Sequence, residues 1–158
     1  MGDPLSRDDR AQVAGSSVDA PPNLGILLRA PFQEVVRRVS SELAAAGFDD
    51  LRPAHTAVFQ HIAPDGSRLT DLAERAQITK QSMGYLVDYL EQRGYLERRP
   101  DPSDRRAALV CLTDRGREEV RAAMAIIRNI ELEWTRALGK QRMRQLRELL
   151  TELGQIMS

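Results

Sequence analysis

The sequence contains a single cysteine, few aromatic residues, no excess charge of either sign and no long apolar run. With Cys111 alone, the chain has no internal disulfide and cannot build a metal site from thiolates. Because Phe, Trp and Tyr make up only 4% of the 158 residues, the core has to be aliphatic and rich in alanine, which favours helices. No uncharged apolar stretch approaches the roughly 18 residues of a membrane-spanning helix.

The charges balance, with 23 Lys and Arg against 23 Asp and Glu. This balance excludes a strongly basic coat and a long acidic tail, but a local basic cluster is still allowed. All of the basic residues except Lys80 and Lys140 are arginine, which suits bidentate contacts with phosphates and bases and which a GC-rich genome would also produce. The N-terminus lacks the basic and apolar pattern of a secretory signal, so we expect a cytoplasmic protein without membrane association.

The hydrophobic pattern divides the chain into four segments. Residues 1–22 are polar and small, with interspersed Pro and Gly, and we expect a flexible tail. Residues 23–52 contain one long helix, which passes through Pro31 and ends before Gly47. Its apolar stripe consists of Leu28, Phe32, Val35, Val39 and Leu43.

The remaining two segments are a compact centre at residues 53–113 and a pair of amphipathic helices at 114–158. In the centre, the pattern predicts a short strand at Arg68-Leu69 and a short helix with Thr70 as its N-cap. Thr79 and Thr113 are the expected N-caps of two further helices. The outer helices carry apolar faces broader than one small centre can cover, which indicates a second subunit.

Two short helices joined by a tight turn are predicted around Gln77 and form a helix-turn-helix. Gln77 stands where many such motifs have Gly, and we expect it to avoid the left-handed conformation. The second helix opens with polar side chains of the kind that reach base edges in the major groove, although a purely structural helix pair would look similar. These candidate recognition residues are Thr79, Lys80, Gln81, Ser82 and Tyr85.

A hairpin is expected next, with strands on either side of residues 100–104. Its five-residue tip contains two prolines, so we expect a projecting loop rather than a tight two-residue turn. Four arginines minus two aspartates give this region a charge of +2, and the arginines are Arg98, Arg99, Arg105 and Arg106. Arginine in such a loop can enter a narrow minor groove, and a nearby carboxylate can orient its guanidinium. A solvated charged turn is the alternative, but the helix pair followed by a hairpin is typical of a winged helix-turn-helix.

The sequence resembles the MarR family of bacterial transcriptional regulators. The resemblance rests on LTDLAERA at 69–76, ITKQSM at 78–83, LVDYLEQRGYL at 86–96, RRPDPSDRRA at 98–107 and LTDRG at 112–116. It implies a mainly α fold with a small β-hairpin wing, that is, a winged helix-turn-helix with N- and C-terminal dimerisation helices. It also implies that Asp104 braces the wing and that Arg106 enters the minor groove.

The resemblance further implies a homodimer that represses transcription from a palindromic operator in double-stranded DNA. The candidate dimer contacts on the last two helices are Val120, Met124, Ile127, Trp134, Leu146, Leu150 and Leu153. Many family members release DNA when a small phenolic or anionic effector enters a cleft beside the DNA-binding lobe. The lining would come from Leu28, Phe32, His55, Phe59, Tyr85 and Tyr89, for each of which core packing is the alternative.

No cofactor or metal is expected. His55 would bind an anion if protonated, but His55 and His61 do not share a helix face, which makes them a poor metal pair. Cys111 is expected to be buried and unreactive. An enzyme is disfavoured because the sequence has no phosphate loop, nucleophile elbow or metalloprotease motif. Two alternatives stay open, namely a winged-helix dimer that binds DNA without an effector and one that binds a protein partner.

Overall fold

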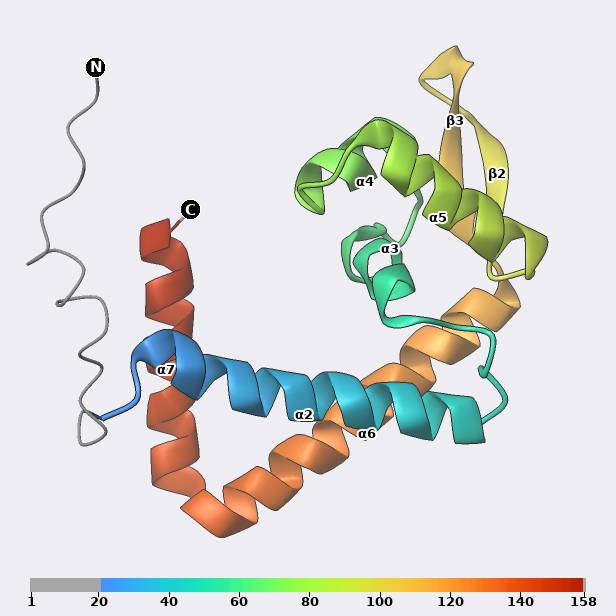
Figure 1. The fold of residues 1–158 in the computed structure, drawn as a ribbon. Helices are drawn as coiled ribbons and strands as arrows, with labels where there is room; N and C mark the ends of the chain where they lie inside the picture. Colours follow the sequence, from blue (N-terminus) through green and yellow to red (C-terminus); the bar gives the residue numbers. More distant parts are fainter. Residues whose placement is uncertain (1–20, 158) are drawn as a thin grey trace, which may run out of the picture. The chain divides into compact units, whose positions relative to one another are not determined.

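The computed structural model describes residues 21–157, apart from the side chain of Arg105. Most of the tail expected at residues 1–22 therefore lies outside the described residues. The chain forms two compact units, divided between Glu34 and Val35. The division falls within helix α2 (Leu24–Ala45), which runs through Pro31 as one long helix (Figure 1).

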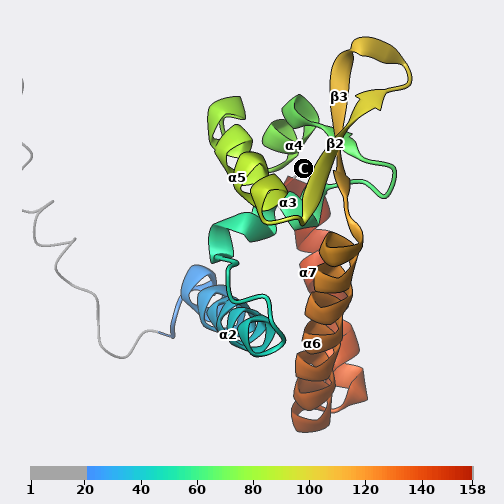
Figure 2. The ribbon, with the colours of Figure 1, turned by 90° about the vertical axis from the view of Figure 1, so that its right-hand side faces the viewer.

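The second unit begins with the remainder of α2 and then contains all other elements. In chain order they are η1 (Pro53–His55), α3 (Thr56–His61), β1 (Ser67–Arg68), α4 (Leu69–Arg75), α5 (Lys80–Gln92), β2 (Leu96–Asp101), β3 (Asp104–Leu112), α6 (Asp114–Leu138) and α7 (Lys140–Met157). The mainly α, winged helix-turn-helix fold expected from the sequence is confirmed. Figure 2 shows the β2–β3 hairpin, the wing, extending beyond α4 and α5.

The core of the winged-helix lobe lies between α3, α4, α5 and the sheet. Met83, Val87 and Leu90 form the inner face of α5 and are buried, as the helical periodicity predicts. Val58 of α3 and Leu72 of α4 meet them in the same cluster. A second, smaller cluster joins the C-terminal half of α2 to α6 and contains Leu43, Ile126 and Ile130.

The sheet has three antiparallel strands in the order β1-β3-β2, so the hairpin is joined by the short strand expected at Arg68-Leu69, which forms one residue earlier. The additional strand is β1, whose Ser67 and Arg68 pair with Val110 and Leu109 of β3. Strand β2 has a free edge, which allows Pro100 to sit in it without leaving a ladder hydrogen bond unmade.

The start of α4 also differs from the sequence prediction, because Thr70 is not its N-cap. The extended residue before the helix is Arg68 (φ −69°, ψ 148°), and α4 begins at Leu69. Leu69 packs against the lobe core, and the helix begins two residues earlier than the capping pattern indicates. The Thr70 hydroxyl instead donates to Asp71 Oδ1 at 3.3 Å.

The turn between α4 and α5 corrects another expectation, because Gln77 has a positive φ of 53°. Its N–H donates to the Glu74 carbonyl at 3.0 Å, and the N–H of Ile78 donates to the Ala73 carbonyl at 3.0 Å. This pair of bonds is a Schellman closure of α4, which requires a left-handed residue at this position. Packing of Ile78 against the core holds Gln77 in that conformation.

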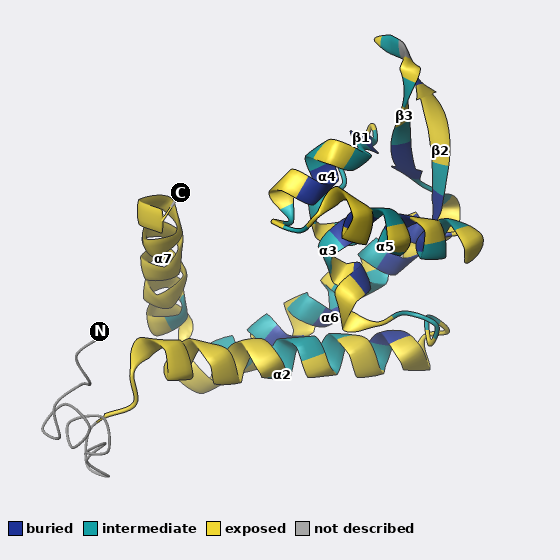
Figure 3. Ribbon diagram, turned by 45° about the horizontal axis from the view of Figure 1, so that its top comes forward, coloured by how far each residue is buried: buried dark blue, intermediate teal, exposed yellow. Residues whose placement is uncertain are grey.

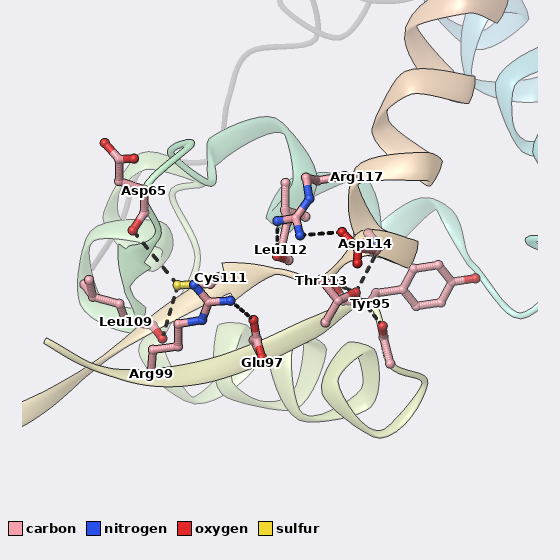
Figure 4. A network of polar contacts seen from close by, with 12 residues as sticks. Asp65, Tyr95, Glu97, Arg99, Leu109, Cys111, Leu112, Thr113, Asp114 and Arg117 are labelled. Atoms are coloured by element: carbon pink, nitrogen blue, oxygen red, sulfur yellow. Dashed lines mark hydrogen bonds and ion pairs between the residues drawn. The ribbon is translucent and has the colours of Figure 1, made fainter.

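Helix α6 is attached directly to the base of the wing (Figure 4). Thr113 is its N-cap, as predicted, and its Oγ1 accepts the N–H of Gly116 at 3.1 Å. A Cβ at Gly116 would lie 2.2 Å from the carbonyl oxygen of Tyr95, so only glycine permits this close approach. Cys111, expected to be buried, lies in β3 at 8% exposure.

Candidate nucleic-acid interface

All five predicted recognition residues are exposed, at the N-cap and in the first turns of α5. Thr79 caps the helix by accepting the N–H of Ser82 at 3.1 Å, and its hydroxyl donates to Ser82 Oγ at 2.8 Å. Gln81 Nε2 donates to the Tyr85 hydroxyl at 3.2 Å, and the Tyr85 side chain is 66% exposed. The structure therefore brings these polar groups together on one outward face.

The wing arginines differ in what holds them. Arg98 and Arg99 form ion pairs, whereas Arg106 is held through its backbone N–H. Arg98 forms ion pairs with two carboxylates of α5, Asp88 at 2.6 Å and Glu91, so it joins the wing to the recognition helix. Arg99 pairs with Glu97 on its own strand. Arg106 is exposed, and its backbone N–H donates to Asp104 Oδ1 at 3.0 Å.

The tip of the wing is tighter than the sequence indicates. Only Pro102 and Ser103 lie between the two strands, so the expected five-residue loop was wrong. Pro100 pairs with Ala108 whereas Asp101 pairs with Asp104, and three residues of β3, at 105–107, therefore have no counterpart on β2. This bulge contains two of the four wing arginines, Arg105 and Arg106.

A carboxylate that sequence reasoning missed anchors the tip. Asp101 is 5% exposed and accepts hydrogen bonds from Arg68 of β1 and from Ser103 of the turn. The bonds from Ser103, together with the guanidinium of Arg68, lower the pKa of Asp101 to about 2. The Asp-Pro-Ser string was a local signal for a side-chain-capped turn, but nothing local pointed to Arg68, 33 residues away.

A second polar junction, also missed from the sequence, centres on Asp50. Its Oδ1 accepts the Tyr95 hydroxyl at 2.6 Å, and its Oδ2 lies 3.3 Å from Arg115 of α6. Its carbonyl accepts the Tyr89 hydroxyl of α5 at 2.7 Å. Burial, followed by the bond to Asp50, raises the pKa of Tyr95 to about 12. The recognition helix, the start of the wing and α6 thus converge on one residue, Asp50, the first through its backbone carbonyl and the other two through its carboxylate.

The predicted effector residues of the second unit take part in packing. The ring of His55 is buried and stacks on Tyr89 with centroids 4.6 Å apart, while Phe59 meets Tyr95 edge-on at 6.1 Å. His55 Nδ1 accepts the N–H of Arg52 at 3.0 Å. Burial, followed by the charge of Arg52, lowers the pKa of His55, which disfavours the protonated form that anion binding would need.

The other predicted effector residues are exposed. Tyr85 lies on the outer face of α5 beside Gln81. Leu28 and Phe32 belong to the first unit, where their side chains are 43% and 66% exposed.

The predicted dimer residues leave apolar surface on α6 and α7 (Figure 3). Met124, Leu146, Leu150 and Leu153 are exposed, and Val120, Ile127 and Trp134 are half-buried. No residue of α7 within its described range is buried. A groove of about 300 Å³ separates the two helices, and it is lined by Glu131, Trp134, Met143, Leu146, Arg147, Leu150 and Thr151.

Within residues 21–157, no cluster of three or more His, Cys, Asp and Glu side chains is arranged to hold a metal ion. None of the helices described there is both long and apolar enough to cross a membrane.

A family model described as the MarR family matches residues 49–107, which contain the helix-turn-helix and most of the wing. The crystal structure of the transcriptional regulator Tm0710 from Thermotoga maritima is 30% identical, with a TM-score of 0.54. That match covers 81% of this chain and 94% of Tm0710. The chain belongs to the MarR family. It is thus a DNA-binding transcriptional regulator and not an enzyme.

Two further comparisons extend this assignment. The transcriptional regulator HosA of Escherichia coli O111:H- is 29% identical over 80% of this MarR-family chain and 90% of its own length. Streptococcus pneumoniae FabT, solved in complex with DNA, is 20% identical and covers 85% of this chain and 94% of its own with a TM-score of 0.73. The FabT likeness establishes the shared fold.

Proposed function

We propose that this protein is a homodimeric repressor that binds a palindromic operator through α5 and the wing. The observation that carries the proposal is the exposed polar start of α5 on the same lobe as an arginine-bearing wing. Polar side chains at the start of a recognition helix read base edges, and arginine in a wing reads the adjacent minor groove. FabT, which shares the fold, has been solved in complex with DNA.

The apolar surfaces of α6 and α7 support the homodimer. Soluble monomers rarely expose large contiguous apolar patches, whereas α7 alone exposes Leu146, Leu149, Leu150 and Leu153. Two identical subunits related by a twofold axis present two recognition helices symmetrically, which requires a palindromic site. A dimer seated on an operator that overlaps a promoter excludes the polymerase, and repression follows.

Selection of bound fragments from a sheared genomic library tests the proposal, with the Arg105→Ala/Arg106→Ala protein as the control. We expect the wild type to recover a palindrome that the control does not recover. The gene beside that palindrome would then identify the regulated function. Recovery of nothing above control at low salt would contradict DNA recognition and favour a protein partner, which a pull-down would identify.

We also propose that a small aromatic effector releases the operator. The support is the stacked His55–Tyr89 pair, because an aromatic ring that inserted there would replace one stacking contact with another. Such a ligand would also disturb the bond between Tyr89 and the Asp50 carbonyl. Titration of the operator complex with phenolic and aryl carboxylate compounds, followed by fluorescence anisotropy, should reveal release. A Tyr89→Ala protein that still binds the operator, and that the same compounds release as they release the wild type, would contradict this location.

A further inference from the structure

The wing tip is attached to β1 by a second set of contacts besides the sheet hydrogen bonds. Arg68 Nε lies 2.8 Å and Arg68 Nη2 lies 2.7 Å from the same oxygen of Asp101, Oδ2. The other oxygen, Oδ1, accepts the backbone N–H of Ser103 at 2.8 Å and its hydroxyl at 2.7 Å. We call Arg68, Asp101 and Ser103 the wing latch. Its central carboxylate is almost fully buried and bonded on both oxygens.

The latch lies where the strand ladder itself is interrupted. The pairing of β2 with β3 breaks between Pro100 and Asp101, and residues 105–107 bulge out of β3 there. The segment beyond the break, Asp101 to Asp104, is therefore held by Arg68 in addition to the single pair that Asp101 forms with Asp104.

The contacts continue from the latch to the bulge. Arg68 Nη2 lies 3.8 Å from Asp104 Oδ2, and Asp104 Oδ1 accepts the backbone N–H of Arg106 at 3.0 Å. The backbone from which Arg106 projects is thus tied through Asp104 to the same guanidinium that holds Asp101. Loss of the guanidinium would free both carboxylates at the tip.

We infer that Arg68 and Asp101 are positioning residues that fix the direction of the Arg106 side chain, and through it the preference for bases flanking the operator. This inference rests on the proposed function, since it assumes that the wing reads DNA. Neither residue needs to contact DNA for this role. Arg68 acts from the strand that precedes the helix-turn-helix, so the wing and α4 share one anchor.

The direction in which Asp101→Asn changes DNA affinity distinguishes a positioning role from a general electrostatic effect. Asp101→Asn keeps an oxygen acceptor for Ser103 and removes the ion pair with Arg68. It also removes a negative charge near the interface, which by counterion release alone would strengthen DNA binding. The wing latch predicts the opposite result for the specific operator.

The test compares wild type, Asp101→Asn and Arg68→Gln on the selected operator with A·T-rich flanks and on the same operator with G·C-rich flanks. We expect both variants to bind the A·T-flanked operator about tenfold more weakly, the loss typical of one base contact. We expect them to lose the flank preference altogether. Asp65→Asn, which makes the same charge change on the exposed turn before β1, is the matched control and should retain the preference.

A double-mutant cycle identifies Arg106 as the group that the latch positions. In the Arg106→Ala background, Asp101→Asn should change affinity for the A·T-flanked operator by less than about twofold, because no side chain is left to position. Additive losses would show that the latch acts through something other than Arg106. A wild-type affinity and flank preference in Asp101→Asn would overturn the inference.

Hydrogen exchange of the free protein tests, without DNA, whether the wing latch holds the tip of the wing. Asp101→Asn should speed exchange at Ser103 and Arg106, whose N–H groups bond Asp101 and Asp104. Unchanged exchange would overturn the latch. If Asp101→Asn speeds exchange as expected but the wild type binds no operator, the proposed function is refuted, and Arg68 and Asp101 have a purely structural role.

Discussion

At the scale of single residues, Glu119 in α6 is the clearest conflict between a side chain and its surroundings. The residue is 4% exposed, and its Oε2 has no hydrogen-bond partner among the described residues. Burial raises the pKa of Glu119 to about 7. Because the unfolded chain releases this proton near pH 4.5 and the folded chain near pH 7, stability falls as the pH rises between these values.

We therefore predict that Glu119→Gln stabilises the protein at pH 8 but changes little at pH 4.5. The pKa shift of Glu119 corresponds to at most about 3.5 kcal/mol of stability at the alkaline end, since one pKa unit is about 1.4 kcal/mol. Urea unfolding at several pH values measures it. Glu118→Gln, an exposed neighbour with the same charge change, is the control, and an equal effect of Glu119→Gln at both pH values would refute the prediction.

Arg106 is the residue on which the wing's role in DNA recognition depends. We predict that Arg106→Ala weakens binding to A·T-flanked operators by about 1–3 kcal/mol, as expected for loss of one specific contact. Arg99→Ala is a useful comparison because Arg99 already pairs with Glu97 on its own strand. Competition binding across operator variants measures the loss of affinity. Unchanged affinity would show that Arg106 does not enter the minor groove.

At the scale of elements, the turn between α4 and α5 stores backbone strain. Gln77 has a φ of 53°, a region that costs an ordinary residue about 1–2 kcal/mol and a β-branched residue more. We predict that Gln77→Val destabilises the protein by about 1–2 kcal/mol, whereas Gln77→Gly is neutral or stabilising. Thermal unfolding measures both, with Gln60→Val on the exposed face of α3 as the control. Equal stability of the Val and Gly variants would contradict a strained turn.

The elements themselves were largely predictable from the sequence. Apolar spacing identified the helices, and Thr79 and Thr113 identified where α5 and α6 begin, because a cap depends on residues within one turn. The errors lie where packing against the core competes with a local signal. Thr70 is not the N-cap because Leu69 packs against the core as part of the helix. Gln77 adopts a left-handed conformation because Ile78 also packs against the core.

At the scale of the whole molecule, the expected assembly depends on the exposed apolar surface of α6 and α7. We predict that Ile127→Glu gives monomers and abolishes operator binding, because a buried charge at a symmetric interface is introduced twice. Asn129→Glu adds the same charge at a neighbouring exposed position and should remain dimeric. Light scattering after size-exclusion chromatography distinguishes them, and a dimeric Ile127→Glu protein would refute this interface.

The sequence alone determined the order of elements, the buried face of α5, its polar start and the presence of a charged wing. These features depend on residues within a few positions of one another, where helical and strand periodicity are visible. Only the tertiary structure decided which wing carboxylate anchors the tip, that Arg98 pairs with α5, and that Asp50 joins Tyr95 to Arg115. The Arg68–Asp101, Asp50–Tyr95 and Asp50–Arg115 contacts join residues 33, 45 and 65 positions apart. Their energies depend on distance and burial in space, which no local pattern contains.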